Sequence, residues 1–147
     1  MARYSVGVRS TGAGSTTLPI GSLYAAANND LHVVEIGAFN TTTTAVNLAV
    51  RRLTTAATQG SGLSEVPWDP DTTAATATAF DTHSSTGPSI TAGFFAHASL
   101  GAAIGAGVIW TFGERGIRIP KGTGNGLCII PGTGSGQILD WYMIWDE

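Results

Sequence analysis

Apolar and polar residues alternate with a period of two in many short segments of this 147-residue chain. In residues 45–53, for example, Val46, Leu48 and Val50 fall on one side of an extended chain and Asn47 falls on the other. This period is typical of β-strands with one buried face, and no segment shows the period of a long amphipathic helix. The segments with strand character are residues 4–9, 31–40, 45–53, 76–81, 90–97, 107–112, 116–119, 126–130 and 137–145.

Glycine, proline, serine, threonine and asparagine gather between these segments. Residues 40–44 have the composition of a hairpin connection, whereas residues 23–28 and 99–104 could form at most a turn or two of helix. About eight to ten short strands separated by turns predict an all-β, single-domain sandwich or jelly roll. We expect an N-terminal strand and an extended arm within residues 1–20, and the jelly-roll domain in residues 21–147.

The last predicted strand is apolar on both faces. One face carries Leu139, Trp141, Met143 and Trp145. The other face carries Ile138, Tyr142 and Ile144. A strand of this kind is normally covered on both sides, but in a two-layer sandwich the second layer covers only one of them. Two hypotheses follow: Ile138, Tyr142 and Ile144 contact another subunit, or a long loop of the same chain covers them.

Charged residues make up only 12% of the chain, about half of what is typical of soluble domains. The net charge is −3 and Lys121 is the single lysine. Such a surface has little charge to repel other copies, which favours a subunit whose faces become buried in an assembly. The absence of a lysine- and arginine-rich cluster argues against nucleic acid as a partner.

Cysteine content and apolar runs narrow the class of protein further. The single Cys128 excludes an intramolecular disulfide and a multi-cysteine zinc site, and its apolar neighbours indicate a buried thiol. Residues 1–6 do not have the pattern of a signal peptide, and no apolar run reaches the ~18 residues that span a bilayer. We therefore expect synthesis in the cytosol and no membrane partner.

Catalytic and ligand-binding patterns are weak throughout the chain. Residues 122–126 and 132–136 are glycine-rich, but neither has the Gly-x-Gly-x-x-Gly spacing nor a following helix, so we expect loops with positive φ. His32, His83 and His97 are far apart, with no His-x-His pair, and we expect structural or surface roles for them. We predict no enzyme, no catalytic residue, no metal and no cofactor; a small hydrolase using these histidines is the least favoured hypothesis.

Three segments in the C-terminal third carry a resemblance to a known family. The residues that carry the resemblance are the segment 112–120, Phe-Gly-Glu-Arg-Gly-Ile-Arg-Ile-Pro, then 126–130, Gly-Leu-Cys-Ile-Ile, and the aromatic strand 141–145, Trp-Tyr-Met-Ile-Trp. In a neutral chain rich in Gly, Thr and Ala, they resemble the small jelly-roll decoration (cement) proteins of tailed bacteriophage capsids. The closing strands are also similar to those of trimeric TNF-like jelly rolls, whose aromatic residues lie near the threefold axis.

This resemblance implies a structural function. Such a protein would form a homotrimer on the outside of the virion capsid and bridge major capsid proteins, often through its N-terminal segment, here residues 2–19. The alternative hypothesis is a carbohydrate-binding module or a phage fibre-tip adhesin. Trp68 and Trp110 would then stack on sugar rings, while Asp and Asn side chains bind the hydroxyl groups.

Overall fold

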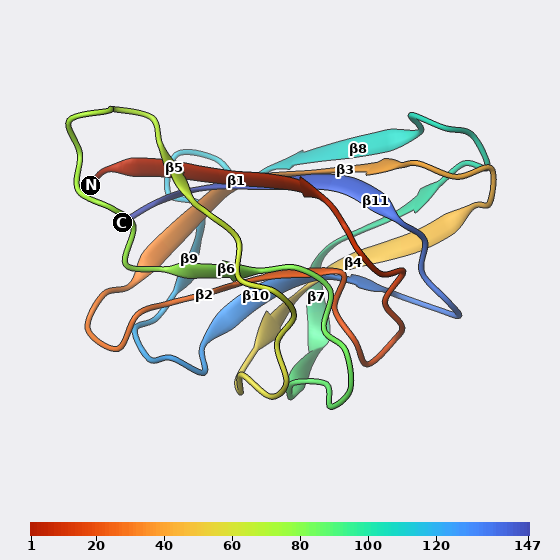
Figure 1. Ribbon diagram of the computed structural model, residues 1–147, viewed down its shortest axis with the longest axis horizontal. Helices are drawn as coiled ribbons and strands as arrows, with labels where there is room; N and C mark the ends of the chain where they lie inside the picture. Colours follow the sequence, from red (N-terminus) through yellow and green to blue (C-terminus); the bar gives the residue numbers. More distant parts are fainter.

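The computed structural model describes residues 1–147 and consists of eleven β-strands joined by turns and loops, without a helix (Figure 1). The strands are β1 (Arg3–Arg9), β2 (Gly21–Tyr24), β3 (Leu31–Asn40), β4 (Val46–Leu53), β5 (Val66–Pro67), β6 (Thr78–Phe80), β7 (Ile90–Leu100), β8 (Gly107–Thr111), β9 (Ile117–Ile119), β10 (Gly126–Pro131) and β11 (Leu139–Asp146). The structure has no helix of the length and apolarity that crossing a membrane would require.

The strands form two antiparallel sheets packed face to face. The first sheet has six strands in the order β5-β1-β11-β3-β8, with β9 also paired to β3, and the second has five in the order β6-β2-β10-β4-β7. The long strands are paired from the outside inward: β1 with β11, β2 with β10, β3 with β8, and β4 with β7. A hairpin folded over on itself in this nested order is a jelly roll. The all-β jelly roll predicted from the sequence is therefore confirmed.

Two strands were not predicted, β2 and β5. Residues 23 and 24 belong to β2 rather than to a helical turn, because β2 pairs with β10 on one side and with β6 on the other. All four residues of β2 are buried, so its sequence shows no alternation that could identify it. The second candidate helix is also absent, since Ser99 and Leu100 end β7 and a turn follows. The two glycine-rich loops do contain a positive φ, at Gly122 (126°) and Gly134 (65°), as predicted.

The main core lies between the two sheets and contains 23 buried residues. The apolar face of β11 belongs to it: Leu139, Trp141, Met143 and Trp145 are all buried. As predicted, buried and half-buried residues alternate along the whole of this strand. The Trp141 ring lies against Gly21 of the second sheet, where a larger residue would meet it.

A second, smaller cluster lies on the outer side of the second sheet. It consists of Tyr24, Ala49, Leu53, Cys128 and Ile130. Loops of the same chain cover it: Ala56 packs against the cluster, and the Tyr24 hydroxyl donates to its carbonyl at 3.2 Å. In consequence β10 is buried on both faces within one chain.

The N-terminal segment lies on the body of the domain. Strand β1 lies in the first sheet between β11 and β5. Residues 10–20 then cross to the second sheet, held by the backbone bond from Ser10 N–H to Leu139 O at 2.8 Å and by the bond from Ile20 N–H to Ile129 O at 2.9 Å. The strand expected in residues 1–20 is present, and the rest of this segment is attached at both of its ends.

Candidate functional site

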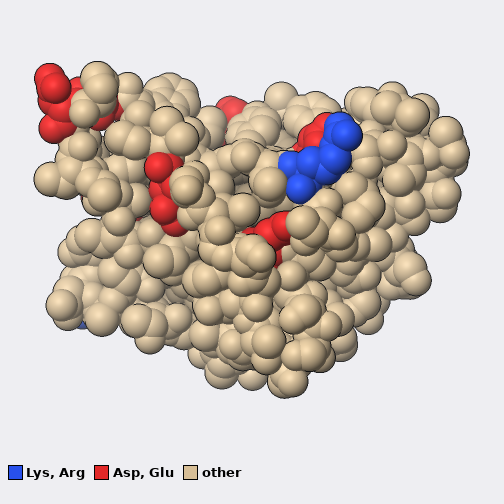
Figure 2. Space-filling view, viewed as in Figure 1, with Lys and Arg blue, Asp and Glu red and all other residues tan.

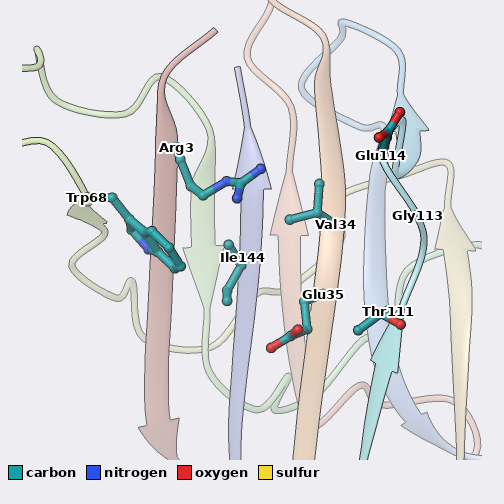
Figure 3. A pocket seen from close by; sticks show the side chains of 8 residues that line it. All are labelled: Arg3, Val34, Glu35, Trp68, Thr111, Gly113, Glu114 and Ile144. Atoms are coloured by element: carbon teal, nitrogen blue, oxygen red, sulfur yellow. The ribbon is translucent and has the colours of Figure 1, made fainter.

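The outer face of the first sheet carries two of the predicted interface residues, Tyr142 and Ile144. It is formed by alternate residues of β1, β11, β3 and β8, and we call it the open face because no loop of the chain packs over its centre (Figure 3). Tyr142 and Ile144 lie at its centre and are half-buried. Their neighbours include Phe39 on β3 and Ile109 on β8, of which Ile109 is 54% exposed.

Two ion pairs stand at the two ends of the β1–β11 pair. Arg3 and Asp146 are opposite each other in the register, and so are Arg9 and Asp140. Each guanidinium donates two bonds to its carboxylate, at 2.7 and 2.8 Å. The hydrogen bond from Arg9 lowers the pKa of Asp140, so that carboxylate stays ionised. The four charges cancel in pairs at the two ends of the face, whereas the Glu35 carboxylate on β3 has no cation as partner.

The Tyr142 side chain is held in one orientation across the open face. Its ring lies over Gly37 of β3, where a Cβ atom would collide with the ring. Its hydroxyl donates a 2.6 Å hydrogen bond to Oε1 of Glu35. Burial, and then the hydrogen bond to the Glu35 carboxylate, raises the pKa of Tyr142 to about 12. The phenol therefore remains a neutral donor, and its ring presents a fixed apolar surface.

A hollow of about 420 Å³ lies at the end of the open face where β1 and β3 begin (Figure 3). It is lined by Arg3, Val34, Glu35, Trp68, Thr111, Gly113, Glu114 and Ile144. Trp68 follows β5 and is 58% exposed, with the Arg3 guanidinium 5.5 Å from its ring centroid. Glu114 lies in the turn after β8 and makes no hydrogen bond or ion pair within the chain. We refer to this feature as the hollow.

The structure separates some of the residues that the sequence singled out. Ile138 precedes β11 and is half-buried, with its carbonyl accepting a 2.6 Å bond from the Thr41 hydroxyl, so it lies at the opposite end of the face from the hollow. Trp110 pairs with buried Ile36 and packs against the main core. Trp68 and Trp110 therefore lie on opposite faces of the first sheet and cannot bind one sugar together.

A second exposed apolar surface was not predicted. It lies at the free edge of the second sheet, and we call it the edge patch: Arg51 and Arg52 of β4 with Phe94 and Phe95 of β7. Phe94 is 59% and Phe95 46% exposed, and the Arg52 guanidinium lies 5.2 Å from the centroid of the Phe95 ring. The register is irregular here, opposite Arg51. Two adjacent phenylalanines break the alternation of a predicted strand, and this feature of the sequence could have indicated the edge patch.

The three histidines lie in three separate environments. His32 bonds through Nδ1 to the carbonyl of Arg115 at 2.7 Å, and His97 bonds through Nε2 to Asn47 at 2.8 Å. His83 is buried and bonds through Nε2 to the Ser22 hydroxyl at 2.9 Å. No group of three or more His, Cys, Asp or Glu residues is placed to hold a metal ion.

Surface charge is sparse over the molecule as a whole. Figure 2 shows one side of it as a largely uncharged surface with a few separate charged side chains. A third Arg–Asp pair, Arg118 with Asp30 at 2.8 Å, brings the paired cations to three of the seven Lys and Arg residues.

Comparison with known proteins gives a likeness among solved structures but none among sequence families. No protein-family model and no curated protein matches the sequence. Among solved structures, the chain is similar to the globular domain of the zebrafish complement 1qA protein, with 11% sequence identity and a TM-score of 0.39 over 99% of this chain and 96% of that chain. The class of the protein, an antiparallel jelly roll, is defined by its own strand order.

Proposed function

We propose that this chain is a non-enzymatic structural subunit that forms homotrimers and decorates the outside of a tailed-bacteriophage head, stabilising it by bridging major capsid proteins. The observation that carries the proposal is the contrast between the two outer faces. Loops of the chain cover the smaller apolar cluster on the outer side of the second sheet, whereas the open face keeps Tyr142, Ile144 and Ile109 accessible between self-neutralised ion pairs.

The open face has the properties of a protein interface. Its centre is apolar and aromatic, and its charges stand at the ends, as in interfaces with an apolar centre and a polar rim. Each Arg–Asp pair is satisfied within the chain, so covering the face would leave these four charges paired, and the Glu35 carboxylate keeps the hydrogen bond from the Tyr142 hydroxyl. Binding would come from apolar and backbone contacts over a large area, and it should persist at moderate salt.

The trimer itself is implied by the resemblance to decoration proteins. A ring of three copies needs two different surfaces on each copy, because the contact is head-to-tail. The chain offers two, the open face and the edge patch. Light scattering on the purified protein should give three times the 15.0 kDa chain mass. A stable monomer at micromolar concentration would count heavily against this proposal.

Attachment to a capsid is the second part of the proposal and has its own test. The purified protein should co-sediment with heads that lack it, and the decorated heads should resist heating or chelation better than bare heads. Protein that forms trimers but stays in the supernatant would limit the proposal to self-assembly. The virion exterior as location, with synthesis in the host cytosol, depends on this experiment.

A saccharide-binding function is the second candidate, and the exposed Trp68 favours it. This ring stands at one side of the hollow beside Arg3, Glu114 stands at the opposite side, and Glu35 lies between them (Figure 3). An aromatic platform flanked by charged planar groups is a combination that binds sugar rings and their hydroxyls. A glycan array should then give hits that Trp68→Ala removes, with Trp110→Phe as the core-facing control; an array without hits removes this candidate.

A further inference from the structure

The hollow and the edge patch are complementary in composition. The hollow combines apolar walls, Val34 and Ile144, with two carboxylates that no cation of the chain neutralises, Glu35 and Glu114. Arg3, the cation in its lining, is already paired with Asp146. The hollow is thus apolar and acidic, and it would favour an occupant that is apolar and basic.

The edge patch has that character. Phe94 lies opposite Arg51 in the register, Phe95 lies under the Arg52 guanidinium, and no acidic residue lines the depression between Arg52 and the two phenylalanines. Arg51 donates to the carbonyls of Thr91 and Ala92, whose oxygens carry no net charge, so its positive charge is not neutralised. An arginine stacked on a phenylalanine is a common anchor in protein interfaces, because it brings both apolar area and charge.

Both surfaces lie at the same end of the sandwich, measured along the direction of the strands. The hollow is at the end of the first sheet where β1 and β3 begin and β8 ends. In the second sheet, β4 ends at this same end, because residues 41–45 connect β3 to β4 at the opposite one, and its last residues form the edge patch. Rotation about an axis parallel to the strands leaves height unchanged. A cyclic assembly can therefore bring the edge patch of one copy against the hollow of the next.

We propose that the occupant of the hollow is a second copy of this chain: the Arg52–Phe95 pair of one subunit docks against Trp68, Glu35 and Glu114 of its neighbour. This inference rests on the self-association proposed above and specifies its two surfaces. The contact joins two different patches. An open chain of copies therefore keeps a free hollow at one end and a free edge patch at the other until the ring closes. The contact at the hollow would also cover Trp68, so saccharide binding and assembly would exclude each other there.

Charge reversal tests the docking. The variants are Glu114→Arg, Arg52→Glu and the double variant, compared with the wild type by sedimentation equilibrium over a dilution series. Each single reversal should weaken association on the order of tenfold, and the double variant should recover to within about threefold of wild type. The matched control is Thr43→Arg, which adds the same side chain at an exposed site at the opposite end of the sandwich and should change nothing.

The outcomes separate the two proposals. The docking is overturned if both single reversals assemble as well as the wild type. It is also overturned if the double variant does not recover. In either case the proposed self-association still stands. A monomeric wild type overturns both. Circular dichroism and unfolding midpoints show whether each variant folds. If Arg52→Glu does not, Arg52→Gln combined with Glu114→Arg takes its place, and it should associate more tightly than Glu114→Arg alone.

Discussion

The hydroxyl of Tyr142 on β11 donates to Glu35 on β3 at 2.6 Å, and the ring between them lies over Gly37. The three residues form one unit: the glycine leaves room for the ring, and the carboxylate holds its outer end. The open face therefore presents a fixed aromatic surface at its centre. A fixed side chain loses little further conformational freedom when a partner covers it, which favours association.

Replacement of Gly37 should destabilise the fold, because a Cβ atom at that position collides with the Tyr142 ring. For Gly37→Ala we expect a loss of about 1–3 kcal/mol in the free energy of unfolding, as for other overpacked sites. Denaturant titration measures it. Gly101→Ala is the matched control, since nothing lies within 4 Å of its Cβ position, and it should change stability by less than about 0.5 kcal/mol. Equal stability of the two variants would refute the packing role.

A charge at the centre of the open face should prevent assembly. In Ile144→Asp the new carboxylate has no cation opposite it, since Ser5 is its neighbour on β1. Burying an unpaired charge costs several kcal/mol, so association should weaken by about a hundredfold or more. Light scattering against concentration is the readout, and Thr43→Asp at the far end serves as control. An Ile144→Asp protein with the wild-type mass would show that the open face is not the subunit contact.

The stability of the fold should depend on pH through His83. Burial lowers its pKa below the 6.5 of an unfolded histidine. Between the two pKa values only the unfolded state binds the proton, so the free energy of unfolding falls as the pH falls below about 6.5, by at most about 1.4 kcal/mol per pH unit. Denaturant titrations across this range should show less pH dependence for His83→Gln than for wild type. If His83→Gln keeps the wild-type slope, the assignment is incorrect.

Cys128 should be inert in the folded protein. Its side chain is fully buried, and burial raises the pKa of the thiol to about 12. Thiol reagents attack the thiolate, so labelling at neutral pH should proceed only as fast as the chain opens and should be complete in denaturant. A Thr43→Cys variant provides an exposed thiol that reacts at once. Rapid labelling of wild type would mean that the loops over the second sheet open readily.

Much of the strand content could be predicted because alternation is a local property. Residues 31–40 were predicted as one strand and form β3 with those bounds, and the buried face of β11 was predicted residue by residue. β2 was missed because both of its faces are buried, which removes the alternation. For the candidate site, the sequence indicated Tyr142 and Ile144 as neighbours on one face, and it indicated Trp68 as a candidate for stacking. Whether other molecules bind there stays a prediction.

By itself, the sequence determined which segments extend into strands and which side chains share a face, because both follow from the two-residue period of the backbone. Strand pairing was decided only by the tertiary structure, since it depends on contacts between segments far apart in the chain. That pairing places Arg3 beside Asp146 and Trp68 beside the open face, and it turns Trp110 toward the core. It also decided that loops cover the smaller apolar cluster of the second sheet and leave the open face bare, which no local pattern encodes.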